Sequence, residues 1–474
     1  MNYDVVIGIE IHLELKTKTK MFSGAPYAFK SEANTCVNEI DLAFPGTLPC
    51  VNMEAVKKAL EACMALHLDI DPLVKFDRKN YYYSDLPKGY QITQQFHPIG
   101  RNGYIDINVE DKTKRIRINR IHMEEDTAKQ FHLFDETLID FNRAGVPLIE
   151  LVSEPDMSSG LEASLYVEKL RQTLLYLDVS DVRMEEGSMR CDVNISIKPE
   201  GSDVFGTKVE IKNLNSINNI KLAIDYEANR QKEALEKGET IYQETRRFDE
   251  KTGTTVSMRK KEGAVDYKYF PEPNIFPILL SDEMLNEVRN NMPELPDQKH
   301  DRYIKEYGLS DAEASTLIQN KEMSLYYDEM MKKAKNAKSA LNLLMSELQG
   351  LLVKNNQNIT NTKVQSESLA ILSNMIEDKE ISGKQAKDVL EAMLDGSDPR
   401  KIVKDRGMKQ VSDEGAILSI VNAVLDENPN SIADYKGGKD RAMGFLVGQV
   451  MKKSKGQANP QMASKLVKQE LDKR

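Results

Sequence analysis

The sequence predicts an α+β protein in which a mixed α/β domain precedes two helical domains. Residues 1 to about 290 combine alternating, strand-like segments with amphipathic helical segments, whereas the pattern beyond Pro293-Glu-Leu-Pro296 is almost wholly helical. Gly396-Ser-Asp-Pro399 then interrupts the helical series. At 474 residues the chain is too long for one ordinary hydrophobic core. We therefore expect three domains, at residues 1–292, 293–405 and 406–474.

The composition predicts a soluble cytoplasmic protein. Hydrophobic residues make up 40% of the chain and charged residues 30%, with no apolar run long enough to span a membrane. The N-terminus enters a strand-like segment directly and lacks the basic and apolar stretches of a signal peptide. The cysteines are scattered, without a Cys-x-x-Cys pair, which favours reduced thiols over a zinc cage or a disulfide framework. They are Cys36, Cys50, Cys63 and Cys191.

Charge is distributed unevenly along the chain. The net charge is −10, but the segment from Lys436 to Arg474 holds ten Lys and Arg residues against three acids, a net of +7. The rest of the chain therefore carries −17. A basic tail on an acidic body is typical of a polyanion-binding segment. A solvated helix face with a frayed end explains the pattern equally well.

The segment Val5–Leu15 has the clearest strand pattern in the chain. From Ile9 onward, apolar residues alternate with Glu10, His12 and Glu14, which is the period-two pattern of a strand with one buried face. Successive polar residues would lie about 7 Å apart on one face. Two carboxylates and an imidazole in such a row suit a cation site or a proton-transfer site. A solvated strand face is the alternative for this segment alone.

The next part of the chain predicts a helix followed by an aromatic, basic segment. Glu54–Leu68 has apolar residues at helical spacing. The segment from Phe76 to Tyr90 then places tyrosines among Arg78, Lys79 and Lys88. Such a segment can stack a base while its cations contact phosphate. Alternatively, its tyrosines close the edge of a sheet.

Three further segments repeat the strand pattern. They are Arg115–Asn119, Met189–Ile197 and Thr207–Lys212. The first runs into Arg120–Asp126, where the phase shifts and Glu124, Glu125 and Asp126 are adjacent. Three adjacent acids repel one another unless a cation or water neutralises them, and a solvated turn is the default explanation.

Carboxylates therefore fall on the polar faces of four strand-like segments. They are Glu10, Glu125, Asp192 and Glu210, and His12 shares these faces. A sheet with helices on one face would gather these residues into one pocket on the other. Oxygen ligands with one imidazole suit Mg²⁺ or Mn²⁺, and Mg²⁺ suits a bound nucleoside triphosphate. No P-loop, dinucleotide fingerprint or serine-nucleophile elbow is present, so a P-loop is excluded as the nucleotide site. The residues alone indicate Mg²⁺-dependent phosphoryl chemistry with RNA as a candidate substrate.

Helical patterns occupy most of the remaining chain. Residues 158–177 and 217–237 predict helices within the first domain. Beyond Pro296, the capping box Ser310-Asp-Ala-Glu313 precedes long amphipathic segments. The last group includes the predicted helices 413–425 and 439–453 and a final basic helix. These modules contain no convincing catalytic cluster, so we assign them to partner or RNA binding.

Long motifs run through nearly the whole chain. They include Gly8-Ile-Glu-Ile-His12, Phe76-Asp-Arg-Lys-Asn80, Leu86-Pro-Lys-Gly-Tyr-Gln91, His122-Met-Glu-Glu-Asp126, Asn142-Arg-Ala-Gly-Val-Pro-Leu148, Ser153-Glu-Pro-Asp156, Met184-Glu-Glu-Gly-Ser188, Arg190-Cys-Asp-Val-Asn194, Lys212-Asn-Leu-Asn-Ser216, Tyr269-Phe-Pro-Glu-Pro273 and Lys455-Gly-Gln-Ala-Asn-Pro460. In these motifs the sequence resembles the B-subunit family of the aspartyl/glutamyl-tRNA(Asn/Gln) amidotransferases. One departure is Ser84, where the family more often has Pro; we expect it to alter a loop and not the chemistry.

The resemblance implies a cradle-shaped catalytic domain, an all-helical domain and a small helical tail domain of the YqeY type that binds tRNA. It implies a heterotrimer with an amidase A subunit and a small C subunit. ATP and Mg²⁺ would serve to phosphorylate the side-chain carboxylate of Glu or Asp misacylated onto tRNA(Gln) or tRNA(Asn). Ammonia, released from glutamine in the A subunit and channelled to this chain, would then displace phosphate. The reaction would be that of a glutamine-dependent ligase that forms a carbon–nitrogen bond.

The resemblance also assigns roles to residues. Glu10, His12, Glu125, Asp192 and Glu210 become the expected metal ligands, with Glu10, His12 and Glu125 also catalytic. Lys79, Lys88 and Arg190 become candidates for phosphate or substrate contacts. Two other functions would fit the same residues: a non-catalytic tRNA-binding scaffold with a structural cation site, and a two-metal nuclease or phosphatase.

Overall fold

The structure is a computed structural model that describes residues 2–28, 30–110, 112–260, 266–408, 414–437, 441–454 and 457–474. Parts of some predicted segments lie outside these residues, namely Asp413 and Lys439 at the starts of two predicted helices, and Lys455 and Gly456 of the last motif. The chain divides into two units, Met1–Pro296 and Asp297–Arg474. The predicted boundary between residues 405 and 406 stays a prediction.

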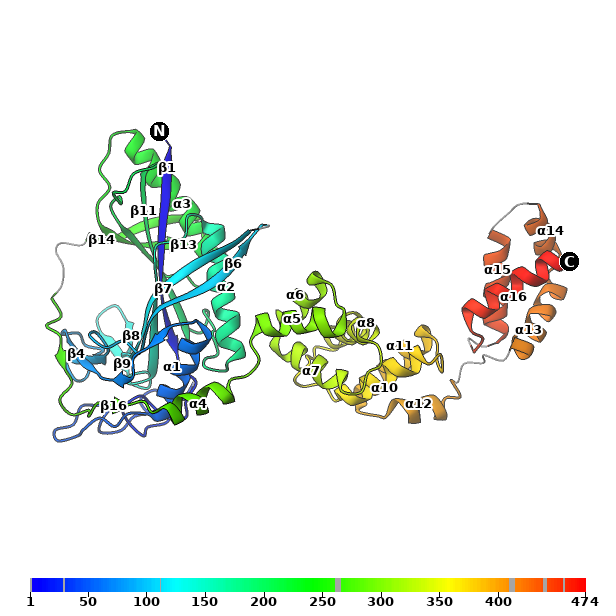
Figure 1. The fold of residues 1–474 in the computed structure, drawn as a ribbon, viewed down its shortest axis with the longest axis horizontal. Helices are drawn as coiled ribbons and strands as arrows, with labels where there is room; N and C mark the ends of the chain where they lie inside the picture. The colour runs from blue at the N-terminus through cyan, green and yellow to red at the C-terminus, as the bar shows by residue number, and fades with distance from the viewer. Residues whose placement is uncertain are drawn as a thin grey trace. The chain divides into compact units, whose positions relative to one another are not determined.

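A nine-stranded sheet forms the centre of the first unit among the described residues (Figure 1). Only β12 and β13 run parallel, and the other neighbouring pairs are antiparallel. In spatial order, the strands are β14 (Thr254–Lys260), β13 (Glu244–Asp249), β12 (Val209–Lys212), β11 (Met189–Pro199), β1 (Tyr3–Glu14), β10 (Pro147–Ser153), β7 (Lys112–Glu125), β6 (Gly100–Val109) and β2 (Asp69–Ile70).

In the part of this unit that the structure describes, three small sheets and four helices accompany the central sheet. The small sheets pair β15 (Phe270–Pro271), β4 (Asp77–Asn80) and β5 (Tyr90–Thr93); β16 (Ile278–Leu279) and β3 (Leu73–Val74); and β8 (Lys129–His132) and β9 (Thr137–Asp140). The helices are α1 (Met53–Ala65), α2 (Gly160–Tyr176), α3 (Ile217–Glu236) and α4 (Asp282–Asn291). Helices α2 and α3 contact each other and the central sheet, so the core lies between them and the apolar face of the sheet.

Local sequence explains the main elements of this core. In β1, Ile7, Ile9 and Ile11 are at most 1% exposed, as the period-two pattern predicts. Ser159 begins α2 by accepting a hydrogen bond from the backbone N–H of Glu162, which satisfies one of the free amides of the first turn. These elements confirm the predicted α+β class, the predicted first strand and the predicted helices near residues 54, 158 and 217.

One glycine permits the close contact between α2 and α3. A Cβ atom at Gly160 would lie 2.5 Å from Asp225 Oδ1 and 2.6 Å from the Lys221 carbonyl oxygen. Because any larger residue would collide with α3, the first turn of α2 can pack there only as glycine. The two helices are therefore held as one layer against the sheet.

The second unit is helical throughout its described residues. Its helices are α5 (Pro296–Tyr307), α6 (Asp311–Ile318), α7 (Lys321–Met331), α8 (Ala337–Asn342), the π-helical η1 (Leu343–Leu348), α9 (Gln349–Lys354), α10 (Ser366–Glu377), α11 (Gly383–Ala392), the 3₁₀ turn η2 (Met393–Asp395), α12 (Pro399–Asp405), α13 (Glu414–Glu427), α14 (Pro429–Lys436), α15 (Arg441–Lys453) and α16 (Pro460–Lys473). The predicted capping box of Ser310 and Glu313 is confirmed at the start of α6. Two separate hydrophobic clusters form, one from residues 303–403 and one from residues 417–471. Within the described part of the chain, no helix has the length and apolar character needed to cross a membrane.

Candidate active site on the polar face of the sheet

Four antiparallel strands bring charged residues from distant parts of the sequence into one row. His12 on β1 lies opposite Arg190 on β11 and opposite Glu150 on β10. Glu150 in turn lies opposite His122 on β7. Directly opposite residues of antiparallel strands point to the same face of a sheet, so these four side chains form a row across β11, β1, β10 and β7. The row is on the face opposite the core, because Ile11 beside His12 is buried in the core.

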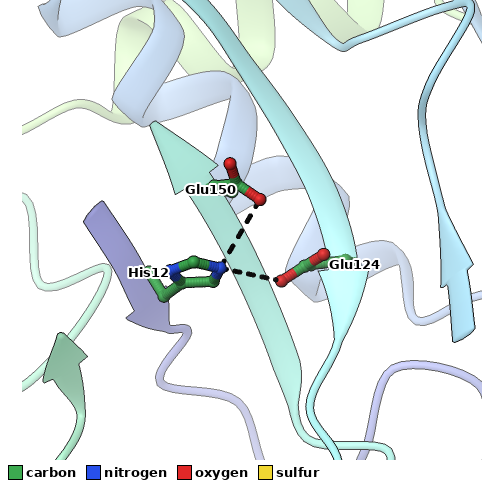
Figure 2. Close-up of side chains that lie close together, drawn as sticks. All are labelled: His12, Glu124 and Glu150. Carbon is green, nitrogen blue, oxygen red and sulfur yellow. Dashed lines mark ion pairs between the residues drawn. The ribbon is translucent and has the colours of Figure 1, made fainter. Parts of the chain in front are cut away.

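Two imidazoles and two carboxylates from this face form a compact group, the His12 cluster (His12, His122, Glu124 and Glu150). His12 Nε2 lies 3.4 Å from Glu150 Oε2 and 3.6 Å from Glu124 Oε1. Dashed lines mark these two ion pairs in Figure 2. His122 Nε2 lies 3.2 Å from the same oxygen of Glu150. The side chain of Glu124 is 3% exposed and that of His12 is 24% exposed. The cluster is therefore largely shielded from solvent and opens to it through His12.

The close contacts shift the proton affinities of the cluster. Burial alone would lower the pKa of His12, but the hydrogen bond to Glu150 and the charges of Glu124 and Glu150 raise it to about 9. Burial raises the pKa of Glu124, and the charge of His12 opposes this effect. Burial would also raise the pKa of Glu150, but hydrogen bonds from the two imidazoles hold it well below its usual range. Without a metal, His12 is thus a protonated partner of two carboxylates at neutral pH.

The same cluster has the donor set of a divalent cation site. Ligand atoms of His12, Glu124 and Glu150 all lie within 4.8 Å of one another. Among the residues that the structure describes, no other group of three His, Cys, Asp or Glu side chains has this arrangement. Two carboxylates and an imidazole suit a cation such as Mn²⁺ or Mg²⁺. A metal bound there would replace the proton that His12 otherwise carries.

Glu125 occupies a different place from the predicted one. Glu124 is two residues from His122 along β7 and therefore shares its face, whereas Glu125 points the other way. Its carboxylate forms an ion pair with Lys88 and accepts a hydrogen bond of 3.0 Å from the backbone N–H of Ile92. The structure therefore places Glu124, and not Glu125, beside His12. A catalytic or metal-binding role for Glu125 stays a prediction.

The three adjacent acids, two at the end of β7 and one directly after it, each contact a different positive group. Glu124, Glu125 and Asp126 are only 3%, 4% and 5% exposed, so the explanation of a solvated turn is wrong. Asp126 accepts a hydrogen bond of 2.8 Å from Arg190 Nη2 and lies 3.5 Å from Arg143 Nε. Because successive residues of a strand point to opposite faces, Glu125 is turned away from Glu124. Each acid contacts its own positive group, so the repulsion among the three acids is reduced.

Three of the other predicted metal ligands lie together near a lysine, in a group that we call the Lys212 cluster (Glu10, Asp192, Glu210 and Lys212). Lys212 Nζ lies 2.5 Å from Asp192 Oδ2 and 3.4 Å from Glu210 Oε1. Glu10 lies opposite Asp192 in the sheet and accepts a hydrogen bond of 2.8 Å from the Asn194 side chain. Of the five predicted ligands, only His12 lies with Glu124 and Glu150. Glu10, Asp192 and Glu210 belong to the Lys212 cluster, and Glu125 lies in neither group.

A cavity of about 830 Å³ opens on this face of the sheet. Its wall includes His12, Arg190, Asp192 and Lys212, so it adjoins both clusters. Among the described residues, five cationic side chains line it: Lys30, Lys129, Arg143, Arg190 and Lys212. Five acids also line it, namely Glu14, Asp140, Glu185, Glu186 and Asp192, and residues 27–28, 30–31 and 213–215 complete most of the wall. A cavity lined by several cations beside a metal-type donor set is suited to phosphate and carboxylate groups.

Of the three predicted phosphate or substrate contacts, only Arg190 lines this cavity. Lys88 is paired with Glu125, and Lys79 Nζ lies 5.0 Å from the ring centre of Tyr267. Tyr267 also makes an edge-to-face contact with Tyr81 at 5.9 Å between ring centres. These contacts support the sheet-edge tyrosine cluster, which was one of the two explanations of this segment.

Sequence reasoning missed His122, Glu124 and Glu150 as site residues. Glu150 is the single acid in the strand Pro147–Ser153, between apolar neighbours. Its burial required a partner, because an unpaired carboxylate in an apolar strand is costly. That signal indicates a paired acid, but it does not identify the partners on β1 and β7.

The fold and the site together define a multidomain α+β protein with an enzyme-like, charged cavity on a central sheet. Residues 5–286 match the family model described as the GatB/GatE catalytic domain, and residues 325–471 match the GatB domain. Over the full length of both chains, the sequence is 51% identical to the B subunits of the aspartyl/glutamyl-tRNA(Asn/Gln) amidotransferases of Geobacillus thermodenitrificans and Staphylococcus aureus (strain bovine RF122), and 52% identical to that of Geobacillus kaustophilus. The chain belongs to this family of amidotransferase B subunits, and the resemblance seen in its motifs is confirmed.

Proposed function

We propose that this chain is the B subunit of a tRNA-dependent amidotransferase. With ATP and Mg²⁺, it phosphorylates the side-chain carboxylate of Glu on tRNA(Gln) or Asp on tRNA(Asn), and ammonia then converts the acyl phosphate into the amide. The observation that supports this function best is the cation-lined cavity beside the His12 cluster, within the region that matches the catalytic domain. Names of the full-length relatives support the same reaction class.

The chemistry explains why such a cavity needs cations and no nucleophilic side chain. A carboxylate is a poor acyl donor, and transfer of a phosphoryl group from ATP gives it a good leaving group. Ammonia attacks the acyl carbon, phosphate leaves, and the surplus proton passes to solvent or a base. In-line phosphoryl transfer depends mainly on positioning and charge neutralisation. Arg190 and Lys212, both on the cavity wall, are placed to orient the substrate carboxylate and the transferred phosphoryl group.

The His12 cluster fits the Mg²⁺ that this reaction requires. His12, Glu124 and Glu150 would hold the ion, on the evidence of their donor atoms and spacing. Bound Mg²⁺ supplies positive charge to the phosphates of ATP. Arg190 forms an ion pair with Asp126, which fixes its guanidinium beside the cavity. The orientation of Arg190 thus depends on its contact with Asp126, which directly follows β7.

The helical unit and the partner subunits extend the proposal. The chain would act with an amidase A subunit, which releases ammonia from glutamine, and with a small C subunit, in the cytoplasm. Its basic end would contact the tRNA backbone, so affinity should fall as salt is added. Deleting the residues after Arg406 in the assembled complex should weaken tRNA binding more than ATP binding. Unchanged tRNA affinity would contradict a role for the tail.

The direct test uses the complex reconstituted with its A and C partners, Glu-tRNA(Gln), Mg²⁺ and γ-labelled ATP. We expect release of labelled phosphate that requires the misacylated tRNA, and Gln-tRNA(Gln) once glutamine or ammonia is supplied. His12→Ala should abolish both products while glutaminase activity of the partner persists at least in part. His132→Ala is the matched control, because His132 is exposed and its ring lies beside the Thr137 hydroxyl, away from the His12 cluster.

The same assay separates the two alternative functions. If tRNA binds but no phosphate is released, the sheet is a binding scaffold and the His12 cluster is a structural cation site. If RNA or phosphate esters are cleaved without the partner subunits, the chain is a two-metal hydrolase. Normal amidation by His12→Ala would contradict the proposed site.

A further inference from the structure

The β8–β9 hairpin continues the wall of the cavity outward. Lys129 and Asp140 are paired at the base of this hairpin and both line the cavity. Phe131 and Leu138 form the next pair on the same side, because residues two apart in a strand share a face. Their side chains are 43% and 51% exposed. An apolar pair therefore lies at the outer rim of a polar cavity.

The base of the hairpin is held firmly against the body of the unit. Arg143 Nε donates a hydrogen bond of 2.9 Å to the Thr127 carbonyl oxygen, and the Asn34 backbone N–H donates one of 3.1 Å to Asp140. Gln130 Nε2 donates a hydrogen bond of 2.8 Å to Ser84 Oγ. The exposed ring of Phe131 is thus carried by an anchored strand.

We infer that Phe131 is a stacking platform for the terminal adenosine of the aminoacyl-tRNA, an inference that rests on the proposed function. The aminoacyl group is esterified to that adenosine, so placing its carboxylate in the cavity brings the base to the rim. A ring with a cation beside it suits a base, and Lys129 Nζ lies 4.9 Å from the centre of the Phe131 ring. The single-stranded end of the tRNA must also leave the cavity, and a route past this rim would carry it over Phe131, whereas ATP has no such continuation.

The hairpin turn limits where the RNA lies. Asp135 and Glu136 occupy the turn, and their charges disfavour phosphate there. Leu133 and Phe134 in the same turn are also exposed, at 52% and 106%, but they lie beside these charges, so we place the contact at Phe131 and Leu138, next to the cavity. This placement predicts one stacked base at the rim and no continuous RNA path along the hairpin.

The first experiment measures steady-state amidation by the intact complex. Phe131→Ala should raise the KM for Glu-tRNA(Gln) about 5- to 150-fold, the range expected from loss of one base–aromatic stack, with kcat and the KM for ATP unchanged. Phe131→Tyr should restore the wild-type KM. The matched control is Phe205→Ala, because Phe205 is also exposed, at 60%, and has Lys198 Nζ 5.8 Å from its ring centre, but it does not line the cavity.

A second measurement isolates the base that stacks. Equilibrium binding of uncharged tRNA, at fixed salt, should be weaker for Phe131→Ala than for the wild-type complex. With tRNA that lacks its terminal adenosine, the two complexes should bind equally. This binding assay needs no turnover, so it tests the inference even if the wild-type complex fails to amidate and the proposed function is wrong.

Three results would overturn the inference. A raised KM for ATP alone would assign the ring to the adenine of ATP. Loss of the assembled complex on gel filtration would make the hairpin a contact for a partner subunit. Equal binding by the wild type and Phe131→Ala to full-length tRNA would leave the ring without a role in the substrate site.

Discussion

The His12 cluster and the Lys212 cluster lie on the same face of one sheet, and both gather carboxylates, yet they neutralise them differently. In the first, Glu124 and Glu150 contact imidazoles. In the second, Asp192 and Glu210 contact a lysine. An imidazole can release its proton near neutral pH and then bind a metal, whereas an ammonium group can do neither without a large cost. A row of acids is therefore not by itself a metal site. The group that neutralises the acids, imidazole or ammonium, determines whether a metal can bind beside them.

The largest difference between the clusters should appear in catalysis. Glu150 contacts both His12 and His122, so Glu150→Gln removes the central charge of the cluster. We expect amidation by the assembled complex to fall by about 10²–10³-fold, the usual effect of losing an electrostatic element of a site. Rates of tRNA-dependent phosphate release measure this loss. Glu168→Gln, on the exposed side of α2, is the control, and wild-type activity of Glu150→Gln would contradict the site.

Metal affinity should depend on pH through His12. Its pKa of about 9 means that a cation binding the neutral imidazole must displace a proton below that pH. Apparent Mn²⁺ affinity should therefore rise about tenfold per pH unit from pH 7 toward pH 9, which is about 1.4 kcal/mol per unit. Calorimetric titration of the metal-free complex at several pH values measures the slope. In His12→Asn the slope should flatten, and a pH-independent affinity of the wild type would exclude His12 as a ligand.

Substitution of Glu124 should mainly change metal affinity, whereas substitution of Glu125 should mainly change stability. Glu125 is buried against Lys88, so Glu125→Gln leaves an uncompensated ammonium group and should lower the free energy of unfolding by about 3 kcal/mol. Its Mn²⁺ affinity should change less than twofold. Glu124→Gln should instead lower Mn²⁺ affinity at least about tenfold, because it removes an anionic ligand. Denaturant unfolding, followed through the transition of the first unit, and the Mn²⁺ titration together distinguish the two variants. Loss of Mn²⁺ affinity in Glu125→Gln and not in Glu124→Gln would restore Glu125 as the ligand.

The smallest effect on the free energy of unfolding is expected in the Lys212 cluster. Lys212→Met removes the cation between Asp192 and Glu210, which should cost about 1–2 kcal/mol, between the values for exposed and buried pairs, because the lysine side chain is 35% exposed. Millimolar Mg²⁺ should raise the unfolding midpoint of this variant more than that of the wild type, since it replaces the lost charge. Lys212→Arg is the control. An equal response to Mg²⁺ would show that the acids alone do not make a cation site.

The sequence by itself determined the elements and the family. Alternation from Ile9 to Leu15 is a local property, and burial of one face of β1 follows from it. The capping residues Ser159 and Ser310 likewise act within one helical turn. His12 was correctly placed on a polar face, because the side on which a residue lies within its own strand needs no knowledge of other strands.

Only the tertiary structure decided which acids meet His12. Glu124 reaches the cluster, and Glu125 does not, because β7 pairs with β10 in a register that places His122 opposite Glu150, after an irregularity between Val152 and Ser153. A shift of one residue would reverse every side chain on that strand. Within β7, alternation with the core residues Ile121 and Met123 already puts His122 and Glu124 on the polar face. That these side chains meet Glu150 and His12 depends on contacts between segments far apart in sequence, which no local pattern in β7 reports.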